Sequence, residues 1–411
     1  MRGRSTPARA GLAALFLGAA VVVPPLTAPT PAQAVECRVG HTVYLHRTSR
    51  NLESPAFEKA WSLAIGRGVT VAVVDSGVDT GNAHLAGDNV LPGKSLLPGY
   101  SDARSDFFGH GTAVAGIIAG QLLAGKSALI GAAPGATILP VRVFYAEPQQ
   151  GSGPVPYPPD TVRLAEGIRW AAGHGADVIN VSLSTPADDP NLGVLKQAVA
   201  YAHRKDAVVV ASGGDTTGKP TTEPRFPAGF PHVIGVAATN GSGVVDNYSV
   251  HGNDIDVSAP GQDVLVAYHA NGDCLSNQQP LTSWAAPFVS AEAALLRERF
   301  PDESADQIEY RIEASADRPT SSRDDDEGWG EIQPYVALTM TLDPNRPGPT
   351  LPGHPPPKPQ KSVAHHVHAL ASTTSPLESV QREGLWWGLG ALGLAALALI
   401  LKPLVEITRR R

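Results

Sequence analysis

The sequence predicts an α/β fold of three layers, in which helices cover both faces of a mainly parallel central sheet. Apolar runs of strand length, such as residues 69–74 and 207–211, alternate with helical stretches such as 161–173 and 192–204. Strands that alternate with helices are typical of a parallel sheet buried on both sides. The chain has 411 residues, 42% of them hydrophobic, so it can bury one large core.

The expected elements follow from the position of these runs. We expect strands at 69–74, 138–144, 177–183, 207–211 and 232–237, and helices at 111–120, 161–173 and 192–204. Within the helix at 161–173, Ile168, Trp170 and Ala171 share the side expected to face the sheet. The Pro- and Gly-rich stretch 147–159 is expected to be a surface loop.

The N-terminus has the pattern of a secretory signal peptide, which we place at residues 1–34. Arginines precede the short apolar run 11–23, and Ala32-Gln33-Ala34 matches a small-residue cleavage site. The run is short for a membrane anchor that stays, and prolines end it. Residues 35–65 would then form an N-terminal extension of the mature chain.

A second apolar run near the C-terminus, residues 385–401, is expected to be a transmembrane helix because it carries no charge. Trp386 and Trp387 stand at its start, and the basic tail 402–411 follows it. Because positive charge stays in the cytoplasm, we expect a single-pass cell-membrane protein whose bulk is extracytoplasmic. Residues 326–384 would form a C-terminal tail of the domain and a proline-rich stalk.

Charge and cysteine usage limit the partners. The net charge is −7 and the folded part has no basic run, so we expect no nucleic-acid partner. Cys37 and Cys274 are a candidate disulfide, because a pair of thiols outside the cytoplasm tends to oxidise. Two free or separately buried thiols are the alternative. The sequence predicts no metal site and no cofactor, since a bare cluster such as His365, His366 and His368 in the stalk is a weak metal signal.

Three motifs far apart along the chain carry the residue types of a catalytic triad. Asp75 follows a buried strand in 73–77, His110 stands between two glycines, and Ser283 belongs to the segment 282–287. A nucleophile, a general base and a carboxylate that orients the base are the parts of such a triad. Singly, each motif also fits a turn, a tight packing site or a helix cap. All three in this order point to serine protease chemistry.

The third motif also predicts local structure. Ser283 is expected at a helix N-terminus, where its own N–H and the helix dipole face developing negative charge. Pro287 is expected in the first turn of this helix, where a missing donor has no cost.

These motifs resemble those of subtilases, the serine proteases of the subtilisin type, over about residues 60–320. Segments 71–79, 109–112 and 282–287 carry the resemblance, and 131–136 supports it. It implies a subtilisin-like peptidase domain, which we place at 66–325. It also implies roles: Ser283 would attack the scissile carbonyl, His110 would transfer its proton, and Asp75 would hold His110 in the right tautomer.

The sequence departs from the family at the oxyanion position. In subtilases an asparagine amide and the serine N–H bind the oxyanion, and Asp215 stands where that asparagine belongs. An ionised carboxylate offers only acceptors, and losing one donor typically lowers turnover by about 10²–10³. A protonated Asp215 would donate one hydrogen bond instead, and desolvation favours that form.

Two further departures concern substrate binding. Leu281 replaces a glycine before the Thr-Ser pair, and we expect it to crowd the substrate pocket. Ser182, Leu183 and Ser184 form the expected substrate-binding strand, where the family often has glycine at the third position. A peptide docks there as an added strand, so these changes predict narrow specificity.

Within the subtilases the layout resembles the mycosins, membrane-anchored proteases of type VII secretion systems. A signal peptide, a short cysteine-containing extension, a proline-rich stalk and one C-terminal membrane helix are the matching features. The resemblance implies an extracytoplasmic serine endopeptidase that cleaves protein or peptide substrates, slowly because of Asp215, beside a type VII secretion membrane complex. The alternative is a pseudoprotease-like structural component of such a complex.

Overall fold

The computed structural model describes residues 37, 39–46, 57–147, 155–276, 279–318 and 322–355. The expected signal peptide, most of the stalk, the expected membrane segment 385–401 and the basic tail lie outside these residues. Among the helices described here, none is long and apolar enough to cross a membrane.

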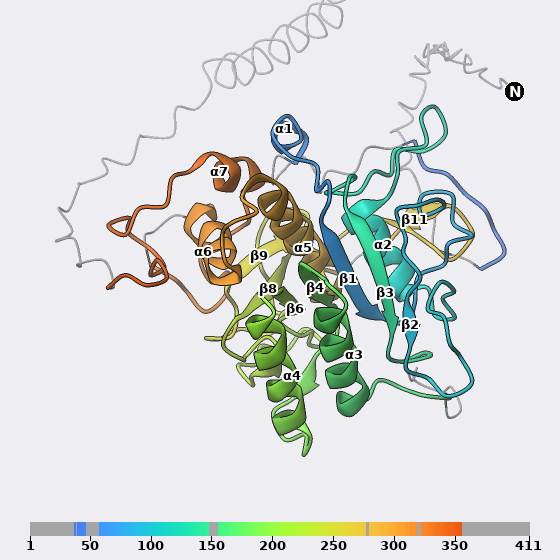
Figure 1. The fold of residues 1–411 in the computed structure, drawn as a ribbon, viewed down its shortest axis with the longest axis horizontal. Helices are drawn as coiled ribbons and strands as arrows, with labels where there is room; N and C mark the ends of the chain where they lie inside the picture. The colour runs from blue at the N-terminus through green and yellow to red at the C-terminus, as the bar shows by residue number, and fades with distance from the viewer. Residues whose placement is uncertain are drawn as a thin grey trace, which may run out of the picture. The chain divides into compact units, whose positions relative to one another are not determined.

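A seven-stranded parallel sheet forms the centre of the domain (Figure 1). Its spatial order is β2 (Lys94–Ser95), β3 (Thr137–Arg142), β1 (Thr70–Asp75), β4 (Val178–Val181), β6 (Val208–Ser212), β8 (Val233–Thr239) and β9 (Val257–Pro260). From β1 the chain builds outward in both directions. The carboxyl ends of strands at such a reversal form a crevice in open α/β sheets, and Asp75 ends β1 there.

Helices cover both faces of the sheet, as the sequence predicts. Val71 and Val73 of β1 belong to the apolar cluster formed with α2 (His110–Ala119) and α5 (Thr282–Arg299). Ala72 and Val74 belong to the cluster with α3 (Thr161–Gly173) and α4 (Leu192–Arg204). This alternation is the two-residue period of a strand buried on both faces.

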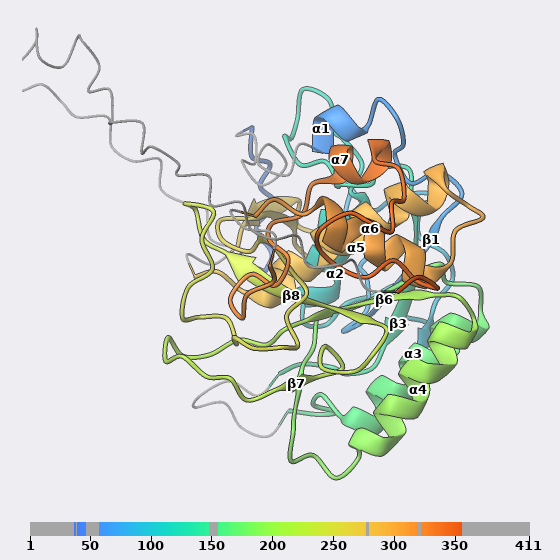
Figure 2. The ribbon, with the colours of Figure 1, turned by 90° about the vertical axis from the view of Figure 1, so that its left-hand side faces the viewer.

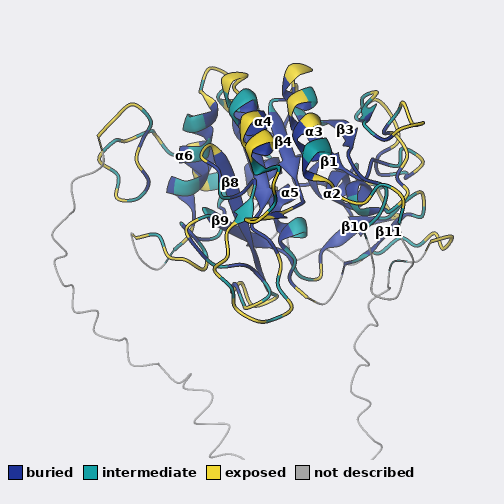
Figure 3. Cartoon of the chain, turned by 90° about the horizontal axis from the view of Figure 1, so that it is seen from below, coloured by how far each residue is buried: buried dark blue, intermediate teal, exposed yellow. Residues whose placement is uncertain are grey.

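The three layers are visible in the figures. Figure 2 shows α3 and α4 side by side, away from α5 and α6 (Ala305–Ser315). In Figure 3 the strands are buried while the outer sides of α3 and α4 are exposed. Ile168 and Ala171 of α3 are fully buried, whereas the half-buried Trp170 stacks on His174 at a ring distance of 4.0 Å.

The folded domain extends beyond the expected limits of 66 and 325 at both ends. Phe57 of α1 (Phe57–Ala60) is buried against Phe288, with ring centroids 6.1 Å apart. At the other end, Ala337 and Leu338 of α7 (Pro334–Thr339) join the same apolar cluster. Leu351, which the sequence places in the stalk, is buried beside Tyr310 of α6. Composition marks these segments as tails, but their few apolar side chains complete the core.

Two small antiparallel pairs lie outside the main sheet: β5 (Thr185–Pro186) with β7 (Arg225–Phe226), and β10 (Leu265–Ala267) with β11 (Asp273–Leu275). The structure has a disulfide between Cys37 and Cys274 of β11, with the Cα atoms 5.3 Å apart. The N-terminal segment is also held by Asp273, whose carboxylate accepts the Leu45 N–H at 2.7 Å.

Glu292, in the middle of α5, is a polar residue in the core that the fold does not satisfy. Its side chain is fully buried, and neither carboxylate oxygen has a hydrogen-bond partner. Burial raises its pKa well above the ordinary value. By contrast, Glu298 near the end of the same helix accepts three backbone N–H groups, from Ile65, Gly66 and Arg67, at 2.6–2.9 Å.

We predict that Glu292→Met stabilises the protein by about 1–3 kcal/mol at neutral pH, because it removes an unsatisfied buried carboxyl group. A raised folded-state pKa leaves stability intact below the ordinary carboxyl value and lowers it as the pH rises above that value. The gain should therefore be larger at pH 7 than at pH 4, as measured by urea unfolding. Glu298→Met is the matched control and should destabilise. Equal effects of the two substitutions would contradict this account.

Candidate active site

The end of β1 and the start of α2 bring Asp75 and His110 into direct contact. The Nδ1 atom of His110 lies 2.9 Å from Oδ1 and 3.0 Å from Oδ2 of Asp75. Asp75 is fully buried, and its Oδ1 also accepts the Ser76 N–H at 2.7 Å. Because Nδ1 faces the carboxylate, it carries the proton, which leaves Nε2 of His110 free for another partner.

The approach of these elements depends on Gly111. A Cβ atom at this position would lie 2.1 Å from the Gly77 carbonyl oxygen and 3.1 Å from the Asp75 Cβ. No other residue lets α2 begin this close to the strand end. The Gly111 N–H also donates to the Ser76 hydroxyl at 3.0 Å, so the contact is bonded as well as close.

Asp106 fixes the start of α2, a role that the sequence analysis did not assign. One carboxylate oxygen accepts the N–H groups of Phe108 and Gly109 at 3.0 and 2.8 Å. The other accepts the Thr112 N–H at 2.9 Å and its hydroxyl at 2.6 Å. These bonds satisfy helix N-terminal donors on both sides of His110 and so set the position of its ring.

The environment of His110 favours its charged form. Burial opposes that form, but the charge of Asp75 and the hydrogen bond to it outweigh burial and raise the pKa of His110 to about 9. Glu147 and Asp106 act in the same direction. The imidazole is therefore a strong base that is mostly protonated at neutral pH.

Ser283 lies in the first turn of α5, at the helix N-terminus as the sequence predicts. The expected place of Pro287 was wrong, since it lies inside the helix rather than in the first turn. A residue at this position would normally donate its N–H to the Ser283 carbonyl, and proline cannot. The Ser182 hydroxyl takes that place, donating to the Ser283 carbonyl at 3.0 Å.

Two further hydrogen bonds between buried side chains hold the Ser182 hydroxyl in this position. Ser290 of α5 donates to Asn180 Oδ1 at 2.8 Å, and Asn180 Nδ2 donates to the Ser182 hydroxyl at 3.0 Å. Asn180 and Ser290 are fully buried. The sequence predicts that Ser182 faces the substrate, but its hydroxyl donates to the Ser283 carbonyl. The sequence does not indicate a role for Asn180 or Ser290.

A cleft of about 560 Å³ brings the predicted residues together. His110, Ser283, Asp215 and Leu281 line it, as do all three residues of the expected substrate-binding strand, Ser182, Leu183 and Ser184. In this state no hydrogen bond joins the side chains of His110 and Ser283, both of which are described. The neighbouring Trp284 packs against His110, with ring centroids 4.8 Å apart.

Asp215 lies just beyond the carboxyl end of β6, beside Ser283. The Thr282 N–H donates to its Oδ1 at 2.7 Å. The side chain keeps exposed surface in the open cleft, but the protein that crowds it displaces enough water to raise its pKa to about 6, against the lowering effect of the bond from Thr282. This carboxyl group is thus anchored by one oxygen next to the candidate nucleophile.

A family model described as "Subtilase family" matches residues 66–330. The chain belongs to the subtilase family. Mycosin-3 of Mycobacterium tuberculosis is 31% identical over 405 residues, which cover 86% of this chain and 82% of that protein. Minor extracellular protease Epr of Bacillus subtilis is 33% identical over 290 residues, which cover 69% of this chain but only 40% of Epr.

Solved structures give the same result. The structure of "MycP3 protease from the type VII (ESX-3) secretion system" matches with a TM-score of 0.62 and 30% identity, covering 76% of this chain and 95% of that one. The protein is therefore a subtilisin-like serine endopeptidase related most visibly to the mycosins, and the predicted family is confirmed.

The cleft of this subtilase contains an acidic residue that sequence reasoning missed. Glu147 lines it, and burial raises the pKa of Glu147 while the charge of His110 lowers it. In the sequence it begins a Pro- and Gly-rich loop and carries no motif, so only the folded chain shows that it faces the cleft. Within the described residues, the group of side chains close enough to share a metal ion is elsewhere, at His203, His232 and Asp306.

We predict that NMR titration of the full chain gives a His110 inflection well above pH 6.5, near the pKa of about 9 that the contact with Asp75 produces. Asp75→Asn keeps the shape of the side chain but removes its charge, so burial should then lower the inflection to the ordinary value or below. An unchanged His110 inflection in Asp75→Asn would disprove the electrostatic origin of the shift.

Proposed function

We propose that this subtilase is a membrane-anchored, extracytoplasmic serine endopeptidase of the mycosin type, associated with type VII secretion, whose turnover is limited by Asp215. The observation that carries the proposal is the Asp75–His110 pair, 2.9 Å apart, whose histidine lines one cleft with Ser283 and Asp215. Its triad residues are Asp75, His110 and Ser283.

The proposed reaction uses the geometry of the pair. Asp75 holds Nδ1–H of His110, so Nε2 accepts the proton of Ser283 as its Oγ attacks the scissile carbonyl. The imidazolium then donates that proton to the leaving amine, and water hydrolyses the acyl-enzyme by the same steps. The buried charge of Asp75 stabilises the imidazolium in both halves.

The developing oxyanion meets an unusual pair of groups. The Ser283 N–H at the start of α5 is one donor. Asp215 stands beside it with Oδ1 bonded to Thr282, so the second carboxyl oxygen is the one available to the substrate. Only a protonated Asp215 donates there, and an ionised one repels the oxyanion.

Two protonation requirements therefore oppose each other. Catalysis needs a neutral His110, whose pKa is about 9, and a protonated Asp215, whose pKa is about 6. Between these values about one molecule in a thousand has both groups in the required state. The proposed slow turnover follows from this conflict.

Substrate docking is proposed along Ser182, Leu183 and Ser184, which line the cleft between β4 and β5. A peptide that adds there as a strand places its scissile bond near Ser283. Leu281 also lines the cleft, where the side chain fills space that a glycine would leave open. We infer a narrow range of protein or peptide substrates.

We predict that Asp215→Asn raises kcat/KM, because the amide keeps an acceptor for the Thr282 N–H and supplies a permanent donor to the oxyanion. Since this variant needs only a neutral His110, its advantage should grow with pH, from about tenfold at pH 7 towards about a hundredfold at pH 8. The measurement is peptide hydrolysis across pH 5–10 by the full-length chain. An unchanged rate would show that Asp215 does not face the oxyanion.

A fluorophosphonate probe supplies the control for that experiment. Wild-type protein and Asp215→Asn should both be labelled, and Ser283→Ala in either background should abolish labelling and hydrolysis. Labelling that persists in Ser283→Ala would place the nucleophile elsewhere, and no labelling of any variant would remove the enzyme proposal.

Asp215 also favours the second candidate, a structural component of a secretion complex that retains the triad. The related mycosins and the "type VII (ESX-3) secretion system" structure support the secretion setting for this chain.

The uncharged run 385–401, with the basic tail after it, supports the membrane anchor.

We predict that a chain ending at residue 384 leaves the membrane fraction, whereas the full chain stays in it after an alkaline wash. In the cells of origin, deletion of the chain should reduce type VII secretion. Ser283→Ala should do the same if proteolysis is required, and should leave secretion intact if the role is structural. Release of the full chain by the wash would disprove the anchor.

A further inference from the structure

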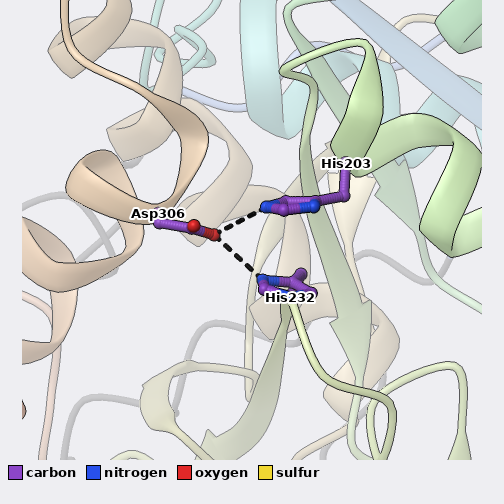
Figure 4. Close-up of side chains that lie close together, drawn as sticks. All are labelled: His203, His232 and Asp306. Carbon is purple, nitrogen blue, oxygen red and sulfur yellow. Dashed lines mark hydrogen bonds and ion pairs between the residues drawn. The ribbon is translucent and has the colours of Figure 1, made fainter. Parts of the chain in front are cut away.

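Two histidines and an aspartate from distant parts of the sequence meet at the edge of the domain opposite the cleft (Figure 4). His203 lies in the last turn of α4, His232 directly precedes β8, and Asp306 lies in the first turn of α6. The amino ends of parallel strands share one edge and their carboxyl ends the other. The start of β8 and the end of β1, which carries Asp75, are therefore at opposite edges.

The two imidazoles point at the same carboxylate oxygen. His203 Nε2 lies 3.0 Å and His232 Nδ1 2.9 Å from Oδ1 of Asp306. The two rings stack, with centroids 3.7 Å apart and planes inclined by 17°. The donor atoms of all three residues lie within 4.8 Å of one another.

This spacing fits a tetrahedral metal site. With metal–ligand bonds of about 2.0–2.2 Å, the donor atoms of tetrahedral zinc lie about 3.4 Å apart. The imidazole nitrogens lie 3.0 and 2.9 Å from Oδ1 of Asp306, so metal binding requires these atoms to move apart by about 0.5 Å and the two stacked rings to tilt until both nitrogens face the ion. In the metal-free protein, hydrogen bonds from both imidazoles to one carboxylate oxygen hold the three side chains together.

The local backbone conformation also holds His232 and Asp306 so that their side chains point toward each other. His232 has a φ of 64°, in the left-handed region that residues other than glycine seldom adopt. The first turn of α6 is anchored beside Asp306, because Asp206 accepts the Ala305 N–H at 2.7 Å and pairs with Arg297 at 3.1 Å. Ser304 adds a capping box to the same turn. Such support from neighbouring residues keeps metal ligands oriented.

We propose that His203 Nε2, His232 Nδ1 and the Asp306 carboxylate form a binding site for a divalent transition metal, with Zn²⁺ as the best fit. Two neutral imidazoles and a carboxylate suit zinc, copper or nickel rather than calcium or magnesium, which prefer oxygen ligands. The side chains of the three residues are 30%, 44% and 34% exposed, so the ion can enter from solvent and water can complete its coordination. The bound ion would join α4, β8 and α6.

The test is titration of the metal-free, full-length chain with Co²⁺, which gives strong visible absorption in tetrahedral sites, followed by displacement with Zn²⁺. The parent protein carries His365→Gln, His366→Gln and His368→Gln, which remove a competing cluster, and all variants are made in this parent. The parent should bind one equivalent of Co²⁺. His232→Asn, which tolerates the left-handed backbone, and Asp306→Asn should each lose the absorption and weaken Zn²⁺ binding at least tenfold.

Two controls separate site binding from other causes. His174→Gln replaces another exposed histidine and should bind like the parent. Zn²⁺ should raise the melting temperature of the parent and of His174→Gln, but not of His232→Asn. Binding that is equal in the parent and in His232→Asn, or an absence of Co²⁺ absorption in the parent, would overturn the proposal. Peptide hydrolysis should be the same with and without the ion.

Discussion

All strands of the central sheet run in one direction, and the candidate site depends on this constraint. Parallel strands place their carboxyl ends at one edge, so Ser182 after β4 and Asp215 after β6 line a common cleft, and Asp75 at the end of β1 contacts His110 of the same cleft. The two remaining groups come from the buried helices α2 and α5, which begin at the same edge with His110 and Ser283. Small residues, above all Gly111, let these helices start close to the strand ends.

Most of this arrangement can be predicted from the sequence because the patterns that indicate it are local. The apolar runs predict the sheet, and Asp75, His110 and Ser283 each stand in a short motif whose glycine, proline or small neighbours have a physical reason. The supporting residues have no such signal. Asp106 is one of two acidic residues in the loop before α2, Asn180 is the single polar residue of β4, and Ser290 is one of several polar residues in α5. Their roles arise from contacts between elements, which no pattern of one element predicts.

The sequence predicts the bounds of α3 and α4 correctly, but not the first turn of α5 or the segments that complete the domain at its two ends. The motif around Ser283 indicated a helix, but the position of Pro287 within it depended on where the helix begins. The first part of the proline-rich segment resembles a linker in composition, yet Leu351 is buried beside α6. The cluster of His203, His232 and Asp306 is likewise invisible in the sequence, because only packing brings α4, β8 and α6 together.

The disulfide has a consequence for the covalent integrity of the protein. The bond between Cys37 and Cys274 closes a ring of chain with a sequence separation of 237 residues, which includes Asp75, His110 and Asp215. Ser283 lies outside this ring, a short distance along the chain beyond Cys274. A single peptide-bond cut anywhere inside the ring, including one made by the enzyme on itself in the 147–159 loop, therefore produces two segments that remain one covalent molecule. A nicked protein would keep its candidate acid, base and nucleophile together until a reductant opened the ring.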